Sequence, residues 1–162
     1  PVVGVDWCDA YSFCKWAGKR LCGKFGGGAN PPADLANEAS SQWYRACSAA
    51  GQNIYPYSAT VFDPGRCNGG STATNEVQDQ AGNPIMSPAC NGGFPGLWQM
   101  SGNVAEWEDS CNGATGASDL CQTRGGAYNN DNNAQQLRCD SNIVNARDTA
   151  AAHIGFRCCI GG

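Results

Sequence analysis

The sequence predicts an α+β domain with two early helices, little further regular structure, and long loops pinned by disulfide bonds. Two segments with helical spacing of apolar residues lie early in the chain, periodicity nearly vanishes after them, and eleven cysteines are spread over all 162 residues. Gly (22) and Pro (8) are frequent enough that much of the chain must be turn and loop. A chain of this length supports one core, so we expect a single domain spanning 1–162.

Residues 6–18 predict the first helix, because Asp6 is suited to cap its start and Gly18 its end. Apolar residues recur there at helical spacing and form one face that we expect to be buried: Trp7, Ala10, Tyr11, Cys14 and Ala17. A second helix is predicted over about 41–50, with Gly51 ending it. Its inward residues are expected to be Trp43, Ala46, Cys47 and Ala50. Short strands are predicted at 96–100, 104–107, 121–128 and 154–160.

The charge balance argues against two classes of partner. A net charge of −4 and a pI near 4.8 give no electrostatic reason to bind nucleic acid or an anionic membrane. No apolar run reaches the length of a membrane span, so we expect none. The chain opens at Pro1 without an initiator Met and without a signal peptide, which predicts a fragment or a processed product.

The scattered cysteines predict disulfide bonds and an oxidising, extracytoplasmic environment. A zinc site is the weaker alternative, because the one close pair is Cys158-Cys159 and the one histidine is His153. Spacing alone favours two pairs: Cys111–Cys121 and Cys67–Cys90. The odd count leaves one cysteine free or paired outside this chain.

Patterns for catalysis are weak in this sequence. No Ser-His-Asp arrangement is legible, and the glycines at 26–28 lack the flanking residues of a phosphate loop. Glu106, Glu108 and Asp109 could form an acid pair for glycoside hydrolysis, but no sequence feature raises a pKa there. Three arginines are expected to pair with Asp or Glu and hold loops: Arg138, Arg147 and Arg157.

Several blocks, in order and with matching spacing, resemble the formylglycine-generating enzyme (sulfatase-modifying factor) family. The first are residues 1–21 and Gln-Trp-Tyr-Arg-Ala-Cys at 42–47. Then come Gly-Leu-Trp-Gln-Met-Ser-Gly-Asn-Val-Ala-Glu-Trp at 96–107, Arg-Gly-Gly-Ala-Tyr at 124–128, Leu-Arg-Cys at 137–139 and Ile-Gly-Phe-Arg-Cys at 154–158. The Gly-Asn-Val-x-Glu-Trp, Arg-Gly-Gly and Gly-Phe-Arg blocks in that order are specific to the family.

The resemblance implies a variant of the C-type lectin fold with a small twisted antiparallel sheet. It covers the C-terminal two-thirds of a family domain, so the strands that normally precede Pro1 are absent or supplied by a partner segment. The family implies two disulfide bonds: Cys14–Cys158 and Cys47–Cys139. Cys8, Cys22 and Cys159 then remain, and we expect Cys8 to pair with Cys22 across the first helix.

The enzymes of this family oxidise a substrate cysteine with copper held by two thiolates, which follow a Gly-Gly-Ser-aromatic block. Here the block ends in Ala127 and Tyr128, and the two ligand positions hold Asn130 and Gln135. An amide does not replace a thiolate for Cu(I). The resemblance therefore implies a non-catalytic domain, with a retained metal-dependent oxidoreductase as the alternative.

Calcium is the cofactor that the resemblance implies. The first site would use the side chains of Gln99 and Glu106 and the carbonyls of Gly102 and Val104, all hard oxygens of the kind calcium prefers. A second site would map to Asn68, Gly69, Asp79 and Ala81. The alternative is that Asn103 and Glu106 only hold the backbone of the loop.

Residues 127–148 are dense in Asn, Gln and Asp, and the family keeps its active site on this exposed face. Adaptable amides with one Tyr resemble a paratope, and retroelement-diversified ligand-binding proteins vary the same stretch of this fold. The expected contacts to an unidentified protein or glycan are Tyr128, Asn129, Asn130, Asn132, Asn133, Gln135, Asn142 and Asn145.

We therefore expect an extracellular, periplasmic or cell-surface binding module that displays this segment. Two alternatives stay open, the first for residues 127–148 and the second for the whole domain. One is a solvated loop without function. The other is a structural subunit of a surface assembly, made by self-assembly or with an N-terminal partner segment.

Overall fold

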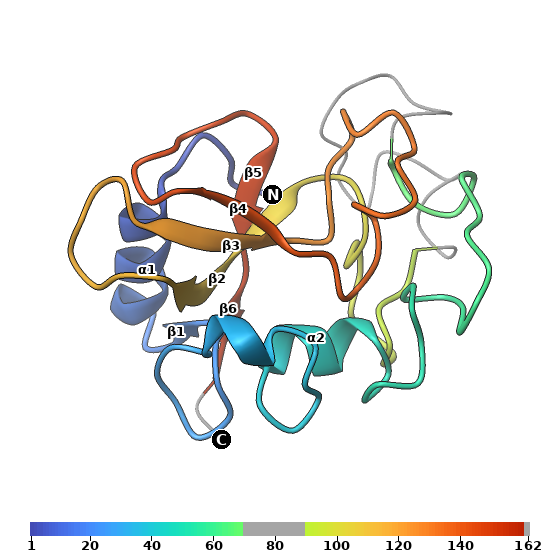
Figure 1. The fold of residues 1–162 in the computed structure, drawn as a ribbon, viewed down its shortest axis with the longest axis horizontal. Coiled ribbons are helices and arrows are strands. Elements are labelled where there is room, and N and C mark those ends of the chain that lie inside the picture. The colour runs from blue at the N-terminus through green and yellow to red at the C-terminus, as the bar shows by residue number, and fades with distance from the viewer. Residues whose placement is uncertain (70–89, 161–162) are drawn as a thin grey trace.

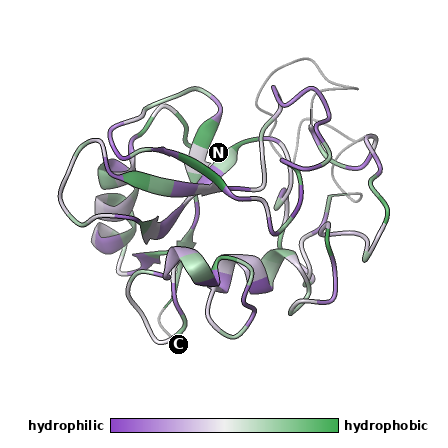
Figure 2. Ribbon diagram, in the orientation of Figure 1, coloured by the Kyte–Doolittle hydropathy of each residue, from purple (hydrophilic) through white to green (hydrophobic). Residues whose placement is uncertain are grey.

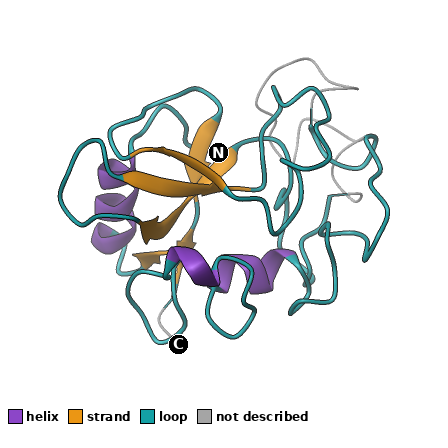
Figure 3. Ribbon diagram, in the orientation of Figure 1, coloured by secondary structure: helices purple, strands orange, loops and turns teal. Residues whose placement is uncertain are grey.

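The computed structural model describes residues 1–69 and 90–160. Figure 1 shows that α1 and the strands gather in one half of the molecule, while the other half is built mainly from loops. Figure 3 shows the same division by element type, with α2 lying across the lower edge in that view. In the described part of the chain, no helix is long and apolar enough to cross a membrane.

Both predicted helices form, and both are shorter than predicted. Helix α1 spans Trp7–Trp16, and the Asp6 carboxylate accepts a hydrogen bond from the Asp9 amide at 2.8 Å. Helix α2 spans Gln42–Cys47 and begins at Ser41, whose hydroxyl accepts from the Tyr44 amide at 3.0 Å. Helix α2 ends before the predicted position because Ala49 and Ala50 take positive φ angles of 52° and 58°.

The buried face of α1 is narrower than its sequence predicts. Trp7, Ala10 and Cys14 are buried, as expected. Tyr11 is 38% exposed and stacks on Trp7 with ring centroids 5.0 Å apart, and Ala17 is exposed. The prediction for these two residues was wrong, because the sheet covers only one stripe of this short helix.

Within residues 1–69 and 90–160, six strands make two sheets. Strands β1 (Arg20–Leu21) and β6 (Cys158–Cys159) form a short antiparallel pair. The second sheet has the order β4-β3-β2-β5, where the strands are β2 (Ala105–Cys111), β3 (Leu120–Arg124), β4 (Ile143–Ala146) and β5 (Ile154–Phe156). A single 3-10 turn, Pro32–Asp34, precedes α2.

The larger sheet is mixed, which corrects the expectation of an antiparallel sheet. Strand β3 is antiparallel to β2 and to β4, but β2 and β5 are parallel. The chain leaves β4 at one edge and crosses to the opposite edge, so β5 starts from the same end as β2. Strands β1 and β4 were not predicted, and residues 96–100 form only an isolated bridge between Trp98 and Asn91.

Five disulfide bonds use ten of the eleven cysteines, and they indicate an extracellular or lumenal environment. Four pairs coincide with those expected: Cys14–Cys158, Cys47–Cys139, Cys67–Cys90 and Cys111–Cys121. The fifth, Cys22–Cys159, replaces the expected Cys8–Cys22 bond. Pairing of β1 with β6 brings Cys22 beside Cys159, whereas Cys8 is exposed on α1 as a free thiol.

The core has two parts. One lies between α1 and the larger sheet and includes Trp7, Trp107 and Ile154. The other surrounds Trp43 of α2 and includes Met100 and the Cys47–Cys139 disulfide. Figure 2 shows that the loop after β3, by contrast, is largely hydrophilic.

Candidate ligand-binding face

The loop that follows β3 starts with a turn that needs glycine. Gly125 and Gly126 have φ angles of +81° and +67°, and a Cβ on Gly125 would lie 2.7 Å from the Met100 carbonyl oxygen. The loop returns to the core at Leu137, which is buried and whose carbonyl accepts from the Ser101 hydroxyl at 2.7 Å. Residues 127–136 are therefore held at both ends.

Polar side chains of this face surround an open hollow of about 590 Å³, which we name the amide hollow. Its lining residues are Asn133, Gln135, Gln136, Arg138, Asp140, Ser141, Asn142 and Ile143. Three of the predicted contacts belong to it: Asn133, Gln135 and Asn142. Amide groups both donate and accept hydrogen bonds, so the hollow suits a polar ligand of mixed hydrogen-bonding character.

One wall of the amide hollow is a bidentate ion pair between Arg138 and Asp140. Arg138 donates from Nε and Nη2 to the two carboxylate oxygens, at 2.6 Å each. These hydrogen bonds from Arg138 hold the pKa of Asp140 below its usual value and raise the pKa of Arg138. The two charges cancel, so this wall presents a guanidinium and a carboxylate in fixed orientations without net charge.

The residue between them is fixed from three sides. Cys139 forms the disulfide with Cys47, and its amide donates to the Ile54 carbonyl at 2.8 Å. Its carbonyl accepts from Nη2 of Arg124 at 2.7 Å. Arg138 and Asp140 therefore flank a rigid point, which preorganises this wall of the amide hollow.

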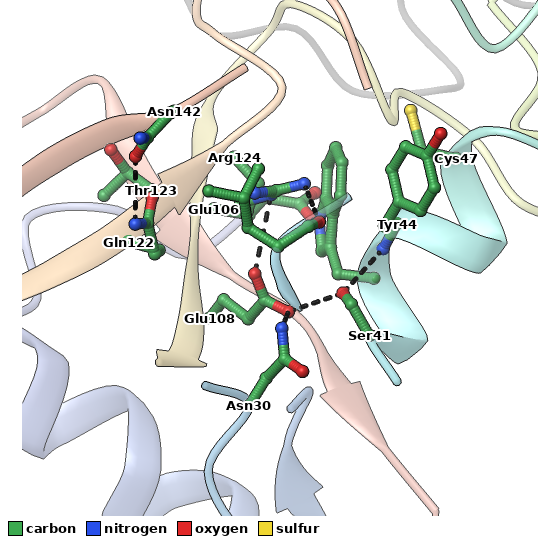
Figure 4. A network of polar contacts seen from close by, with 12 residues as sticks. Asn30, Ser41, Tyr44, Cys47, Glu106, Glu108, Gln122, Thr123, Arg124 and Asn142 are labelled. Carbon is green, nitrogen blue, oxygen red and sulfur yellow. Dashed lines mark hydrogen bonds and ion pairs between the residues drawn. The ribbon is translucent and has the colours of Figure 1, made fainter. Parts of the chain in front are cut away.

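The floor of the hollow contains a polar group without a partner. Ser141 is buried, and its hydroxyl has no hydrogen-bond partner in the described part of the chain. Beside it, Gln122 of β3 donates to the Asn142 side chain at 3.0 Å, as Figure 4 shows. The carbonyl oxygen of the Gln122 side chain is also buried and unpartnered within residues 1–69 and 90–160. A buried polar atom without a partner costs free energy, and neither oxygen is exposed to a ligand in this structure.

Several predicted contact residues hold the loop instead. The side-chain oxygen of Asn130 accepts from the Ala127 amide, and its Nδ2 donates to the Gln136 side chain. Asn133 accepts from the amides of Gln135 and Gln136 at 3.1 and 3.3 Å, and Asn145 donates to the Thr123 hydroxyl at 2.9 Å. These bonds compete with any ligand, because the same polar atoms are already used.

The other predicted contacts remain open to a ligand in different degrees. Asn129 and Gln135 are exposed, and Tyr128 is half-buried. Asn132 is half-buried, with a φ of +54° and its amide donating to the Gly69 carbonyl at 2.7 Å. Of the two positions where the family has copper-binding thiolates, Asn130 is therefore part of the loop scaffold and Gln135 lines the amide hollow.

The first predicted calcium site is brought together only in part. Both carboxylate oxygens of Glu106 accept hydrogen bonds from Arg157, and one also accepts from Nε1 of Trp43 at 2.8 Å. Gln99 is buried, and its side-chain oxygen has no partner among the described residues. Gly102 and Val104 lie between them on the same buried turn. A cation there would have Gln99 and main-chain carbonyls as ligands, and Glu106 only if Arg157 released it.

The second predicted calcium site falls largely outside the described residues, because Asp79 and Ala81 lie there. The carbonyls of Asn68 and Gly69 accept hydrogen bonds from the amides of Asn103 and Asn132, each at 2.7 Å. These bonds tie the residues around 68 to the turn at 103 and to the loop at 132.

Beneath the face lies the buried polar network of Figure 4. The Arg124 and Glu108 side chains form an ion pair at 3.5 Å with no exposed surface on either. Glu108 also accepts from the Ser41 hydroxyl at 2.6 Å and from Asn30 at 3.4 Å. Burial raises the pKa of Glu108, although Arg124 opposes this, and burial lowers the pKa of Arg124.

No sequence feature raises a pKa near Glu108 and Asp109, yet burial in the fold raises the pKa of both. The fold alone supplies that burial. The prediction for the three arginines was right: Arg138 pairs with Asp140, Arg147 with Asp119 and Arg157 with Glu106. Arg138, Asp140 and Ser141 lie within the predicted 127–148 surface and line the hollow, but they were not among the expected ligand contacts.

A family model described as the sulfatase-modifying factor enzyme 1-like domain matches residues 1–161. The chain belongs to this family. It is 27% identical over 179 residues to the formylglycine-generating enzyme of Mus musculus, and 30% identical over 173 residues to the inactive C-alpha-formylglycine-generating enzyme 2 of Bos taurus. These alignments cover 98% and 99% of this chain but 43% and 50% of the relatives, so the chain spans about half their length.

Solved structures agree on the fold of this family member. The structure of CarF gives a TM-score of 0.57 at 18% identity and covers 98% of this chain and 66% of that chain. PvdO from Pseudomonas aeruginosa gives 0.51 at 20% identity and covers 96% and 60%. The fold is therefore the α+β, C-type-lectin-like fold of the family. Relatives named as enzymes and relatives named as inactive both match, so family membership alone does not decide catalysis.

Proposed function

We propose that this domain is a non-catalytic binding module and that the amide hollow is its ligand site. The observation that supports this most directly is that several polar side chains of the predicted 127–148 surface gather at one open hollow. Gln135 is exposed there, the Arg138–Asp140 pair is directed by hydrogen bonds, and the buried Ser141 hydroxyl has no partner in the described chain. The ligand is a protein segment or a glycan, and the domain acts outside the cell or at its surface.

The non-catalytic half of the proposal is supported by the two positions where the family has thiolates. Asn130 uses its amide to hold the loop, and Gln135 presents an amide to the hollow. Neither group binds Cu(I) as a thiolate does. The competing function is an oxidoreductase with other ligands, and it requires a metal site that these residues do not supply.

We also propose calcium as a stabilising ion, held near Gln99 through its buried, unpartnered oxygen and through main-chain carbonyls. Glu106 supports this less well, because Arg157 already neutralises its carboxylate. Thermal unfolding of the metal-free protein, with and without added calcium, tests it. A raised thermal midpoint in calcium that Gln99→Ala removes is expected, and an unchanged midpoint contradicts it.

The test of the amide hollow is a comparison of two matched variants on arrays of glycans and of peptides. Gln135→Arg puts a large charged side chain into the hollow. Gln52→Arg makes the same change at an exposed residue that does not line it. Ligands retained by wild type should bind Gln52→Arg equally and Gln135→Arg at least about tenfold more weakly. Equal binding by both variants contradicts the proposal.

A further inference from the structure

A second concave site lies at the opposite end of β4 from the amide hollow. It is a cleft of about 670 Å³ between α1 and the loop that joins β2 to β3, and we name it the α1 cleft. Trp7 and Tyr11 form its aromatic side, and the backbone at 28–29 and 113–114 forms narrow edges. Its polar side chains are Asp109, Asn112 and Arg147. The amide hollow and the α1 cleft share no lining residue.

Asp109 is the open acceptor of this cleft. It is half-buried on β2, and its carboxylate makes no hydrogen bond or ion pair with the described residues. Burial raises its pKa, while the nearby charges of Arg20 and Arg147 lower it. A carboxylate without partners at the wall of a cleft accepts strong hydrogen bonds from ligand hydroxyl or amide groups.

Tyr11 supplies an aromatic surface beside that carboxylate. It stacks on Trp7 with planes 18° apart, which covers one of its faces, and it stays 38% exposed. Trp7 itself is 9% exposed, with the Arg147 guanidinium 4.6 Å from its ring centroid. The ring of Tyr11 is therefore the part of the pair that a ligand can contact.

The walls of the α1 cleft are rigid. Arg147 donates to the carbonyls of Gly113 and Ala114 at 2.6 and 2.8 Å, and the Cys111–Cys121 disulfide closes the loop at its base. Trp7 is held by its indole hydrogen bond to the Glu108 carbonyl at 3.0 Å. A site already held in one conformation loses little entropy when a ligand binds.

We propose that the α1 cleft binds the ring of a neutral saccharide, with Tyr11 beneath the ring and Asp109 accepting from its hydroxyl groups. An aromatic face with a few directed polar groups fits a flat ring whose edge carries hydroxyls. A cationic amine could pair with Asp109, but the charges of Arg20 and Arg147 already act on that carboxylate and oppose a further cation, although Asp119 offsets part of the Arg147 charge. The proposal is independent of the function assigned to the amide hollow.

Saturation-transfer NMR of the whole chain with glucose, galactose, mannose and N-acetylglucosamine tests the proposal, with ethylamine as the cationic probe. At least one sugar should receive saturation from wild type. Tyr11→Ala should abolish it, and Asp109→Asn should weaken binding about tenfold or more through loss of a charged acceptor. Trp16→Ala is the control, because Trp16 is an 81% exposed aromatic on the same helix outside the cleft.

Three results would overturn the proposal. One is the absence of saturation transfer to every sugar. Another is transfer to ethylamine alone, which would assign the cleft to a cation. The last is sugar binding that persists in Tyr11→Ala but is lost in Gln135→Arg, which would assign the sugar site to the amide hollow. Thermal midpoints of Tyr11→Ala and Asp109→Asn close to that of wild type verify that the variants remain folded.

Discussion

Arg124 and Glu108 form an ion pair with no exposed surface, at the point where the binding face rests on the core. Arg124 also donates to the carbonyls of Leu35 and Cys139 and lies 5.0 Å from the Trp43 ring centroid. One guanidinium thus joins the loop before α2, the loop behind the amide hollow and the core. Removing one partner of such a pair leaves a buried charge uncompensated, which costs more than the pair contributes.

Arg124→Met should therefore lower the free energy of unfolding by about 3–5 kcal/mol. The matched control is Arg66→Met, whose ion pair with Asp63 is about half exposed on both sides. That variant should change stability by about 0–1 kcal/mol. Urea denaturation of both variants measures the difference, and equal losses would contradict the structural role of Arg124.

Asp140 makes the stability of the folded chain depend on pH. Its pKa is lowered in the folded state, chiefly by hydrogen bonds from Arg138. The ionised Asp140 carboxylate therefore stabilises the folded state fully at pH values above the pKa of an unfolded Asp. This contribution to the free energy of unfolding is lost as the pH falls through the lower pKa of the folded state. Carboxyl NMR titration should give Asp140 a pKa below the usual value of an aspartate side chain. Arg138→Gln should raise it toward that value, and an unchanged pKa in the variant would contradict the pair.

Among the elements, α2 is the one most dependent on a single residue. It is only six residues long, so its own hydrogen bonds stabilise it little. Ser41 caps its first turn by accepting from the Tyr44 amide and also donates to buried Glu108. Asp6 at the start of α1 makes the capping bond alone.

Ser41→Ala should therefore cost more stability than Asp6→Ala. Loss of a cap costs about 1 kcal/mol, and a hydrogen bond to a charged group adds about 1.5–3 kcal/mol. We expect about 2–4 kcal/mol for Ser41→Ala and about 1 kcal/mol for Asp6→Ala, measured by thermal and urea unfolding. A smaller loss at Ser41 would show that Glu108 does not need its hydroxyl.

At the scale of the whole molecule, the features that the sequence predicts are those set by the spacing of nearby residues. Asp6 and the apolar spacing after it were enough to locate α1, and block order was enough to indicate the fold. Strands β1 and β4 were missed because each is short and depends on partners distant in the chain. The Cys22–Cys159 bond was missed for the same reason, because the two cysteines are 137 residues apart in the chain. The Arg138–Asp140 pair is local, and the sequence left open only which acid pairs with Arg138 and that the pair lines a hollow.

The covalent framework makes a direct prediction about thiols. All eleven cysteines lie in the described part of the chain, and Cys8 is the one that forms no disulfide there. A thiol reagent should modify one group per chain without denaturant, and Cys8→Ser should remove that reaction without lowering the thermal midpoint. Two or more reactive thiols in the native wild type would contradict the pairing.

The central claim is that a face used for copper chemistry in the family serves here for binding. Cys8→Ser protein, which lacks the one free thiol, should be incubated with Cu(I), and bound copper and oxygen uptake with a cysteine-containing peptide should be measured together. We expect copper well below one ion per chain and no peptide-dependent oxygen uptake. One bound copper per chain with peptide-dependent oxygen uptake would contradict the binding function and favour the oxidoreductase.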